Sequence, residues 1–137
     1  MSRNNNLSGG LFAAKPTPLT IRETPLSAMI AEYLDARAIY NDRLNCGKIR
    51  TENGHWLHLC KTGTPDRFAI LRGQIIFIEV KMFGGKTSPQ QKAKHDELCG
   101  HGAIVLIADS FDEFIGKFTA IRAALKAFSA RKENLYD

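Results

Sequence analysis

The stretch Gly63–Lys81, which reads GTPDRFAILRGQIIFIEVK, decides the fold of this chain. It contains two runs rich in β-branched and aromatic residues on either side of Arg72-Gly73, and this pattern predicts a β-hairpin. If Arg72-Gly73 is a two-residue loop, counting outward along both strands places Asp66 opposite Glu79. The two carboxylates are therefore predicted to be cross-strand partners.

Three charged side chains are predicted to converge at the open end of this hairpin. Directly opposed residues have Cβ atoms about 4.5–5.5 Å apart, so Asp66 and Glu79 would repel one another unless a cation lies between them. Lys81 follows Glu79 by two residues and shares its face of the strand, whereas the Val80 side chain points to the other face. A one-residue change in loop length would break this arrangement, because Asp66 would then lie on the opposite face.

Two carboxylates and a lysine in this arrangement indicate phosphodiester hydrolysis. Mg²⁺ prefers oxygen ligands, often one or two carboxylates together with waters and phosphate oxygens. The metal lowers the pKa of a bound water, and the Lys81 ammonium can orient that water or offset charge that develops on a phosphorane. In the alternative interpretation, Asp66 begins a strand after a proline turn, and Glu79 and Lys81 form a solvated strand end. The continuous apolar run 75–78 argues against it, because such runs are typical of strands buried on both faces.

A helix and another strand are predicted after the hairpin. Ser88 is the expected N-cap of a helix that has Pro89 in its first position and runs to about Cys99. Gly100-His101-Gly102 ends this helix before the apolar segment 103–108. The succession of strand, helix and strand predicts a parallel, right-handed crossover with the helix N-terminus near the phosphate site.

In these residues the chain resembles the VRR-NUC domains of the PD-(D/E)xK nuclease superfamily. The resemblance covers roughly residues 23 to 110, and it lies in the order and context of several short motifs. Those motifs fall on Glu23, Gly63-Thr64-Pro65-Asp66, Glu79-Val80-Lys81, Ser88-Pro89-Gln90-Gln91 and Gly102. The resemblance implies an α/β fold with a restriction-endonuclease-like core. In that core a mixed central β-sheet is flanked by helices in the order αβββαβ, here with an extra C-terminal helix.

The resemblance also implies a set of site residues for a nuclease that depends on Mg²⁺ or Mn²⁺. Asp66, Glu79 and the Val80 carbonyl correspond to metal ligands, Lys81 to the catalytic lysine and Gln91 to a supporting residue of the active site. Gln90 is the neighbouring alternative to Gln91, because only one of two adjacent helical residues should point inward.

Glu23 corresponds to a further metal ligand in this family. Its place rests on its spacing to the apolar residues of the first helix, and Glu32 lies within the same helix. A carboxylate near a helix N-terminus is equally well explained by the helix macrodipole.

The length of 137 residues fits one nuclease domain, expected over residues 23–137. Residues 1–22 contain an asparagine run, Ser8-Gly9-Gly10 and two prolines, and we interpret them as a flexible tail. No stretch near 18 apolar residues and no signal-peptide pattern is found in the sequence. We expect the protein in the cytoplasm of a bacterial or phage-infected cell.

The three cysteines, Cys46, Cys60 and Cys99, lack a paired spacing, and an odd number argues against a disulfide framework. A zinc site could be drawn from Cys46, His55, His58 and Cys60, but the short Cys-x-x-Cys grouping is missing. His95 and His101 are interpreted as a helix-surface residue and a turn residue.

Helix and hairpin signals complete the expected architecture. Thr24 and Pro25 start a first helix whose apolar stripe is formed by Leu26, Met29, Ile30, Tyr33 and Leu34. Strands are expected between residues 40 and 60, with a hairpin at Asn53-Gly54. Ser110 and Glu113 form a capping box before a final helix with a long apolar stripe of Phe114, Phe118, Ile121, Leu125 and Phe128. That stripe fits either the intramolecular core or a dimer interface.

The net charge of +5 and the pI of about 9.3 favour a polyanionic partner. Many cations are expected to border the cleft: Arg43, Lys48, Arg50, Lys61, Lys86, Lys92 and Lys94. Arg50 and Lys86 are the predicted DNA contacts, and each has an ordinary solvated surface charge as its alternative.

The sequence contains no zinc finger, recognition helix or aromatic RNA platform, which favours recognition of nucleic-acid shape. The resemblance implies a homodimeric, structure-selective DNA endonuclease that acts on four-way junctions, and a two-fold dimer matches the symmetry of a junction. Three alternatives remain: a flap or restriction-type nuclease, a non-catalytic DNA-binding module, and a structural protein assembled through the last helix.

Overall fold

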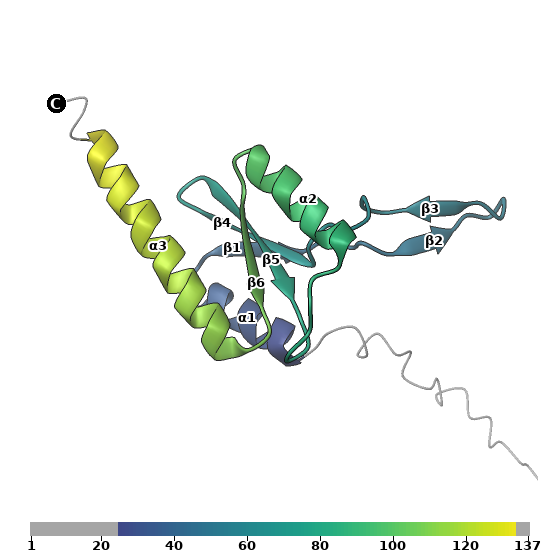
Figure 1. Cartoon of the computed structure of the whole chain (residues 1–137), viewed down its shortest axis with the longest axis horizontal. Helices are drawn as coiled ribbons and strands as arrows, with labels where there is room; N and C mark the ends of the chain where they lie inside the picture. The colour runs from purple at the N-terminus through teal and green to yellow at the C-terminus, as the bar shows by residue number, and fades with distance from the viewer. Residues whose placement is uncertain (1–24, 134–137) are drawn as a thin grey trace, which may run out of the picture.

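The computed structural model describes residues 25–133, a mixed α/β arrangement of three helices and a mixed central sheet (Figure 1). Residues 1–24 lie outside this range, so the predicted tail, Glu23 and the Thr24 cap fall outside the described residues. In chain order the elements are α1 (Pro25–Ala36), β1 (Tyr40–Arg43), β2 (Lys48–Arg50), β3 (Trp56–His58), β4 (Arg67–Leu71), β5 (Gln74–Val80), α2 (Pro89–Gly100), β6 (Ile104–Ala108) and α3 (Phe111–Glu133).

The central sheet has the strand order β1-β4-β5-β6. β1, β4 and β5 pair antiparallel, whereas β5 and β6 pair parallel through the crossover helix α2, as the sequence predicts. The α/β class and the mixed sheet are thereby confirmed. Within residues 25–133, none of the helices is both long and apolar enough to cross a membrane.

The hairpin of β4 and β5 has the predicted register. Leu71 pairs with Gln74, and the ladder continues outward to the pair of Arg67 and Ile78. Arg72 and Gly73 both have positive φ, 51° and 75°, which is the conformation of a type I′ turn. Because the twist of this turn matches that of the flanking strands, the two-residue loop fixes which side chains share a face.

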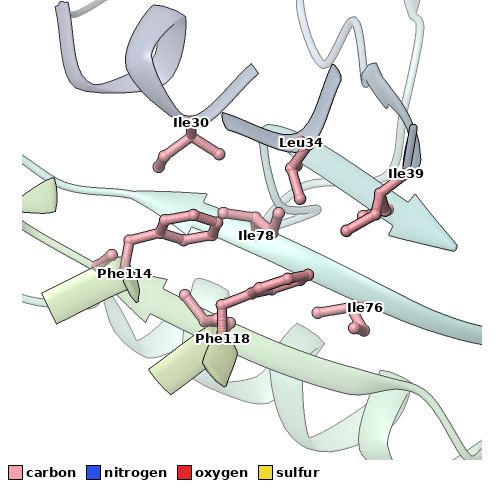
Figure 2. Packing of buried hydrophobic residues seen from close by; sticks show 10 residues of the cluster. Ile30, Leu34, Ile39, Ile76, Ile78, Phe114 and Phe118 are labelled. Atoms are coloured by element: carbon pink, nitrogen blue, oxygen red, sulfur yellow. The ribbon is translucent and has the colours of Figure 1, made fainter. Parts of the chain in front are cut away.

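A single apolar cluster fills one face of the sheet. Ile76 and Ile78 of β5 point toward Phe114 and Phe118 of α3, while α1 covers the same face (Figure 2). Tyr33 of α1 meets both phenylalanine rings edge to face, with centroids 5.6 and 6.0 Å apart. The alternating side chains of β5 therefore place the apolar residues under α1 and α3, and Glu79 on the opposite face.

Helix α2 lies against that opposite face, and its first turn is tightly capped. The Ser88 hydroxyl accepts a hydrogen bond from the Gln91 N–H at 3.2 Å, and the Gln91 side chain accepts one from the Ser88 N–H at 3.0 Å. This capping box, with Pro89 in the first turn, confirms the predicted helix start. The cap fixes the side chain of Gln91 as well as the helix end.

Two apolar stripes are shorter than the sequence suggests. In α3, Phe114 and Phe118 are fully buried, but Phe128 is 59% exposed because the C-terminal half of the helix extends beyond the sheet (Figure 1). In α1, Met29 is 44% exposed and lies outside the core. Each stripe therefore contributes only part of its length to the core, and Met29 and Phe128 are its exposed members.

The strands expected between residues 40 and 60 divide between two sheets. β1 joins the central sheet, whereas β2 and β3 form a separate two-stranded hairpin that projects from the body (Figure 1). We call this projection, residues 48–58, the hairpin arm. Its turn is longer than the Asn53-Gly54 dipeptide, because Thr51 and His55 still exchange hydrogen bonds at the base of the loop.

The loop that precedes β4 is seated against α2, and a pair of glycine substitutions tests this contact. A Cβ on Gly63 (φ 84°) would lie 2.6 Å from the Gln90 carbonyl oxygen, whereas nothing lies within 4 Å of a Cβ on Gly73 (φ 75°). At both positions an alanine in the left-handed backbone conformation costs about 1–2 kcal/mol. We expect Gly63→Ala to lower the free energy of unfolding, measured in urea, by clearly more than Gly73→Ala does. Equal losses would contradict the close contact between this loop and α2.

Candidate active site

Glu79 lies at the centre of a polar cluster beneath α2. The residue is 3% exposed, and burial raises the pKa of its carboxyl group, as does the negative charge of Asp66. Lys81 partly offsets both effects, and the resulting pKa of Glu79 is about 7. A carboxylate in this position is electrostatically unfavourable without a nearby cation.

Gln91 connects the residues of the cluster. Its Nε2 donates a hydrogen bond to Glu79 Oε1 at 3.1 Å, and its Oε1 accepts one from Lys81 Nζ. The same Oε1 accepts the capping hydrogen bond from the Ser88 N–H. Gln90 is exposed, so the structure selects Gln91 as the inward residue of the pair.

Lys81 is held directly beside Glu79. Its Nζ lies 3.6 Å from Glu79 Oε1, and its side chain is 14% exposed. The Lys81 N–H donates to the Ala108 carbonyl at 2.9 Å, which anchors the backbone just beyond β5 to the end of β6. The ammonium is therefore fixed in a partly enclosed position where it can contact a bound anion.

His95 is the residue that the sequence interpretation missed. It was predicted on the helix surface, but it is 6% exposed and its Nε2 lies 3.6 Å from Glu79 Oε2. Both atoms are buried without a hydrogen-bond partner in the described part of the chain. Burial, followed by the positive charge of Lys81, lowers the pKa of His95. The spacing of four residues from Gln91 was the available signal, because it puts both side chains on one face of α2.

Asp66 stands across the hairpin from Glu79. Its Oδ2 accepts a hydrogen bond from the Val80 N–H at 3.1 Å, as expected when the hairpin register is extended by one residue. Asp66 is exposed and lines a cleft of about 680 Å³ that opens toward the hairpin arm. The other residues lining this cleft are Arg43, Leu44, Asn45, Cys46, Gly47, Lys48, Ile49 and Leu59.

The remaining predicted site residues lie within the cluster's own segment, on the surface, or outside the described residues. Val80 lies between Glu79 and Lys81 at the end of β5. Arg50 is exposed on the hairpin arm, and Lys86 is exposed in the loop between β5 and α2. Glu23 lies outside the described residues.

The cluster offers oxygen ligands to a hard divalent cation. Within residues 25–133, no group of three or more His, Cys, Asp and Glu side chains is placed to hold a metal ion. Two carboxylates are nevertheless the usual protein contribution to a Mg²⁺ site that keeps several waters. The buried Glu79 Oε2, which lacks a hydrogen bond, is an available ligand atom, so the residues present fit such an ion.

The four residues of the alternative zinc site do not form such a site. At the base of the hairpin arm the Cys46 thiol donates to the Pro65 carbonyl at 3.7 Å and the Cys60 thiol donates to the Asn45 carbonyl at 3.4 Å, and both cysteines are free of disulfides. Burial, the neighbouring Cys60 and nearby negative charges raise the pKa of Cys46 to about 12. This cysteine is a neutral thiol at physiological pH, and zinc binds the thiolate form.

Part of this chain is similar to a phage protein. It is 42% identical over 53 residues to "Putative nuclease p44" of Acyrthosiphon pisum secondary endosymbiont phage 1, a match that covers 38% of this chain. The chain spans 57% of the length of that relative. No family model matches the sequence.

The raised pKa of Glu79 predicts a pH-dependent cost to folding. Between about pH 4.5 and 7 the folded protein binds more protons than the unfolded chain, so stability should fall as the pH rises through this window. Above about pH 7 the loss in free energy of unfolding should be on the order of 3 kcal/mol, since one pKa unit corresponds to about 1.4 kcal/mol.

We therefore expect Glu79→Gln, in EDTA, to be more stable than the wild type at pH 8 and to lose most of this advantage near pH 5. Urea denaturation of both proteins at both pH values measures the difference. An advantage that is equal at both pH values would show that the charge of Glu79 is not the cause.

Proposed function

We propose that this protein is a metal-dependent nuclease that hydrolyses phosphodiester bonds. The observation that carries the proposal is the convergence of Asp66, Glu79 and Lys81, with Gln91 bonded to both Glu79 and Lys81. The similarity to a phage protein whose name describes it as a nuclease supports the same activity.

In this proposal Asp66, Glu79 and the Val80 carbonyl hold Mg²⁺ or Mn²⁺. A bound divalent ion supplies a water of lowered pKa and neutralises charge on the phosphate. The chain prepares this site by burying Glu79 and by placing a second carboxylate near it, so that cation binding relieves a repulsion already present in the protein. Glu23 is a further proposed ligand from the segment before α1.

The other residues of the cluster have distinct roles. Lys81 stabilises the negative charge that develops on the phosphorane oxygens, and its ammonium can also orient the attacking water. Gln91 holds Lys81 and one oxygen of Glu79 in place, so that the two groups keep a fixed separation. His95 lies beside the second oxygen, with its Nε2 3.6 Å from Glu79 Oε2, and limits the directions from which a ligand can reach that atom.

We further propose that the substrate is DNA, that branched DNA such as a four-way junction is preferred, and that the protein is a VRR-NUC-type member of the PD-(D/E)xK superfamily. The net charge of +5 and the cations of the cleft, Arg43 and Lys48, favour a polyanion. Arg50 and Lys86 are proposed phosphate contacts. Such an enzyme would act in the cytoplasm of a bacterial or phage-infected cell.

Cleavage of end-labelled DNA tests the activity. We expect the protein to nick a four-way junction in Mg²⁺ and not in EDTA, and Lys81→Ala to lower the rate by about 10²–10³-fold, the usual cost of removing one charge-stabilising donor. Lys126→Ala, which changes an exposed lysine of α3, is the matched control and should cleave normally.

The metal site has a separate readout. Mg²⁺ or Mn²⁺ should raise the melting temperature of the wild type and of Lys81→Ala at pH 8, and should not raise that of Glu79→Gln.

In the cleavage assay, equal cutting of junction, duplex and single strand would contradict the proposed structure selectivity. DNA binding without cleavage in any metal would favour the alternative of a non-catalytic DNA-binding module.

A homodimer is part of the proposal, and the structure offers one surface for it. β6 is an edge strand of the central sheet, and a groove of about 400 Å³ between β6 and α3 is lined by Ile104, Val105, Leu106, Ile107, Lys117, Ala120 and Ile121. An apolar groove beside an open strand edge is suited to a second copy of the chain.

We expect Ala120→Arg to halve the mass measured by light scattering, because the new side chain would fill the groove. Thr119→Arg places the same side chain at an exposed neighbouring position outside the groove and should leave the mass unchanged. A dimer that persists in Ala120→Arg would place the interface elsewhere.

A further inference from the structure

The hairpin arm has two chemically different faces. Its register pairs Lys48 with His58, Ile49 with Leu57, and Arg50 with Trp56. Because directly opposed residues share a face and successive residues alternate, Lys48, His58, Arg50 and Trp56 lie on one side. Ile49 and Leu57 lie on the other side.

The first of these, which we call the cationic-aromatic face, is open to solvent. All four of its residues are exposed, and the Trp56 side chain is 65% exposed. A large exposed tryptophan on a projecting hairpin contributes little to the fold, and two-stranded hairpins are marginally stable by themselves. Two cations beside an exposed aromatic ring form a surface that contacts phosphates and stacks on a base.

Hydrogen bonds connect the base of the arm to the segment that carries Asp66. At its base the Leu44 N–H donates to the Asp66 carbonyl at 2.7 Å, and the Cys46 thiol donates to the Pro65 carbonyl at 3.7 Å. Lys48 and Asp66 line the same cleft. A strand bound along the arm would therefore run toward the proposed metal ligand.

We propose that the hairpin arm binds a DNA strand with unpaired bases, with Trp56 stacked on a base and Lys48 and Arg50 on the flanking phosphates. This inference rests on the proposed function and makes it more specific, since it requires that the branched substrate present unpaired bases, as a flap or an opened branch point does. The positive charge of this face favours DNA over a second copy of this basic chain. Stacking requires an exposed base face, which a continuous duplex does not offer.

Trp56 is the single tryptophan of the 137-residue chain, so intrinsic fluorescence reports on it alone. We would titrate the full-length protein in EDTA with a 15-nucleotide oligo-dT strand, a blunt duplex and heparin. The anisotropy of labelled DNA would measure binding independently. The strand should quench Trp56 emission, whereas the duplex and heparin should leave it nearly unchanged, because neither presents a free base to the ring.

Variants separate stacking from charge and from folding. Trp56→Ala should weaken binding of the strand by about tenfold or more, the usual effect of losing one stacking aromatic, and Trp56→Phe should restore most of it. Leu57→Ala, on the opposite face of the same strand, is the matched control and should bind within about twofold of the wild type.

Several outcomes would overturn the inference: strand binding without quenching, equal quenching by heparin or duplex, or an equal loss in Leu57→Ala. If junction cleavage persists while quenching is absent, the arm assignment fails and the nuclease stands. If quenching is present without cleavage in any metal, the arm assignment stands and the proposed catalysis fails.

Discussion

The opposition of Asp66 and Glu79 across the β4–β5 hairpin is the constraint on which the site depends. A two-residue turn with positive φ at Arg72 and Gly73 fixes the register, and the register puts both carboxylates on the face covered by α2. Burial and the charge of Asp66 raise the pKa of Glu79 to about 7, so its carboxyl group loses its proton less readily than that of an exposed glutamate. Under the proposed function a bound cation would make the same arrangement favourable, and the apolar cluster on the other face of β5 offsets its cost in the absence of a cation.

The capping box of α2 connects local helix formation to the chemistry of the site. Gln91 satisfies the Ser88 N–H as part of the helix start, and the same amide group contacts Lys81 and Glu79. A glutamine in this position therefore has each polar atom occupied, which restricts its rotamers and those of its partners. The parallel crossover brings this helix start to the ends of β5 and β6. Under the proposed function, the positive end of the helix dipole would then lie near the bound phosphate.

Much of the fold could be predicted from local sequence patterns. Contacts between elements that are distant in the sequence could not. The hairpin register and the Ser88 cap depend on residues close together in the chain, the parallel β6 follows from the succession of strand, helix and strand, and the structure confirms all three. The burial of His95 depends on how α2 rotates over the sheet, which a helix of low overall hydrophobicity does not reveal. The separation of β2 and β3 from the central sheet likewise depends on the competition between strands for pairing, which propensity alone does not decide.

The hairpin arm is exposed to solvent, whereas the centre of the candidate site is buried. Glu79 is buried and held by a network, which suits a group whose position must be exact during chemistry. The arm has few tertiary contacts beyond its base, so its exposed side chains can adapt to an irregular strand without disturbing the sheet. Hydrogen bonds connect the base of the arm to the Pro65 and Asp66 carbonyls. Under the proposed function, this connection would couple substrate binding on an adaptable surface to a rigid catalytic centre through the segment that carries Asp66.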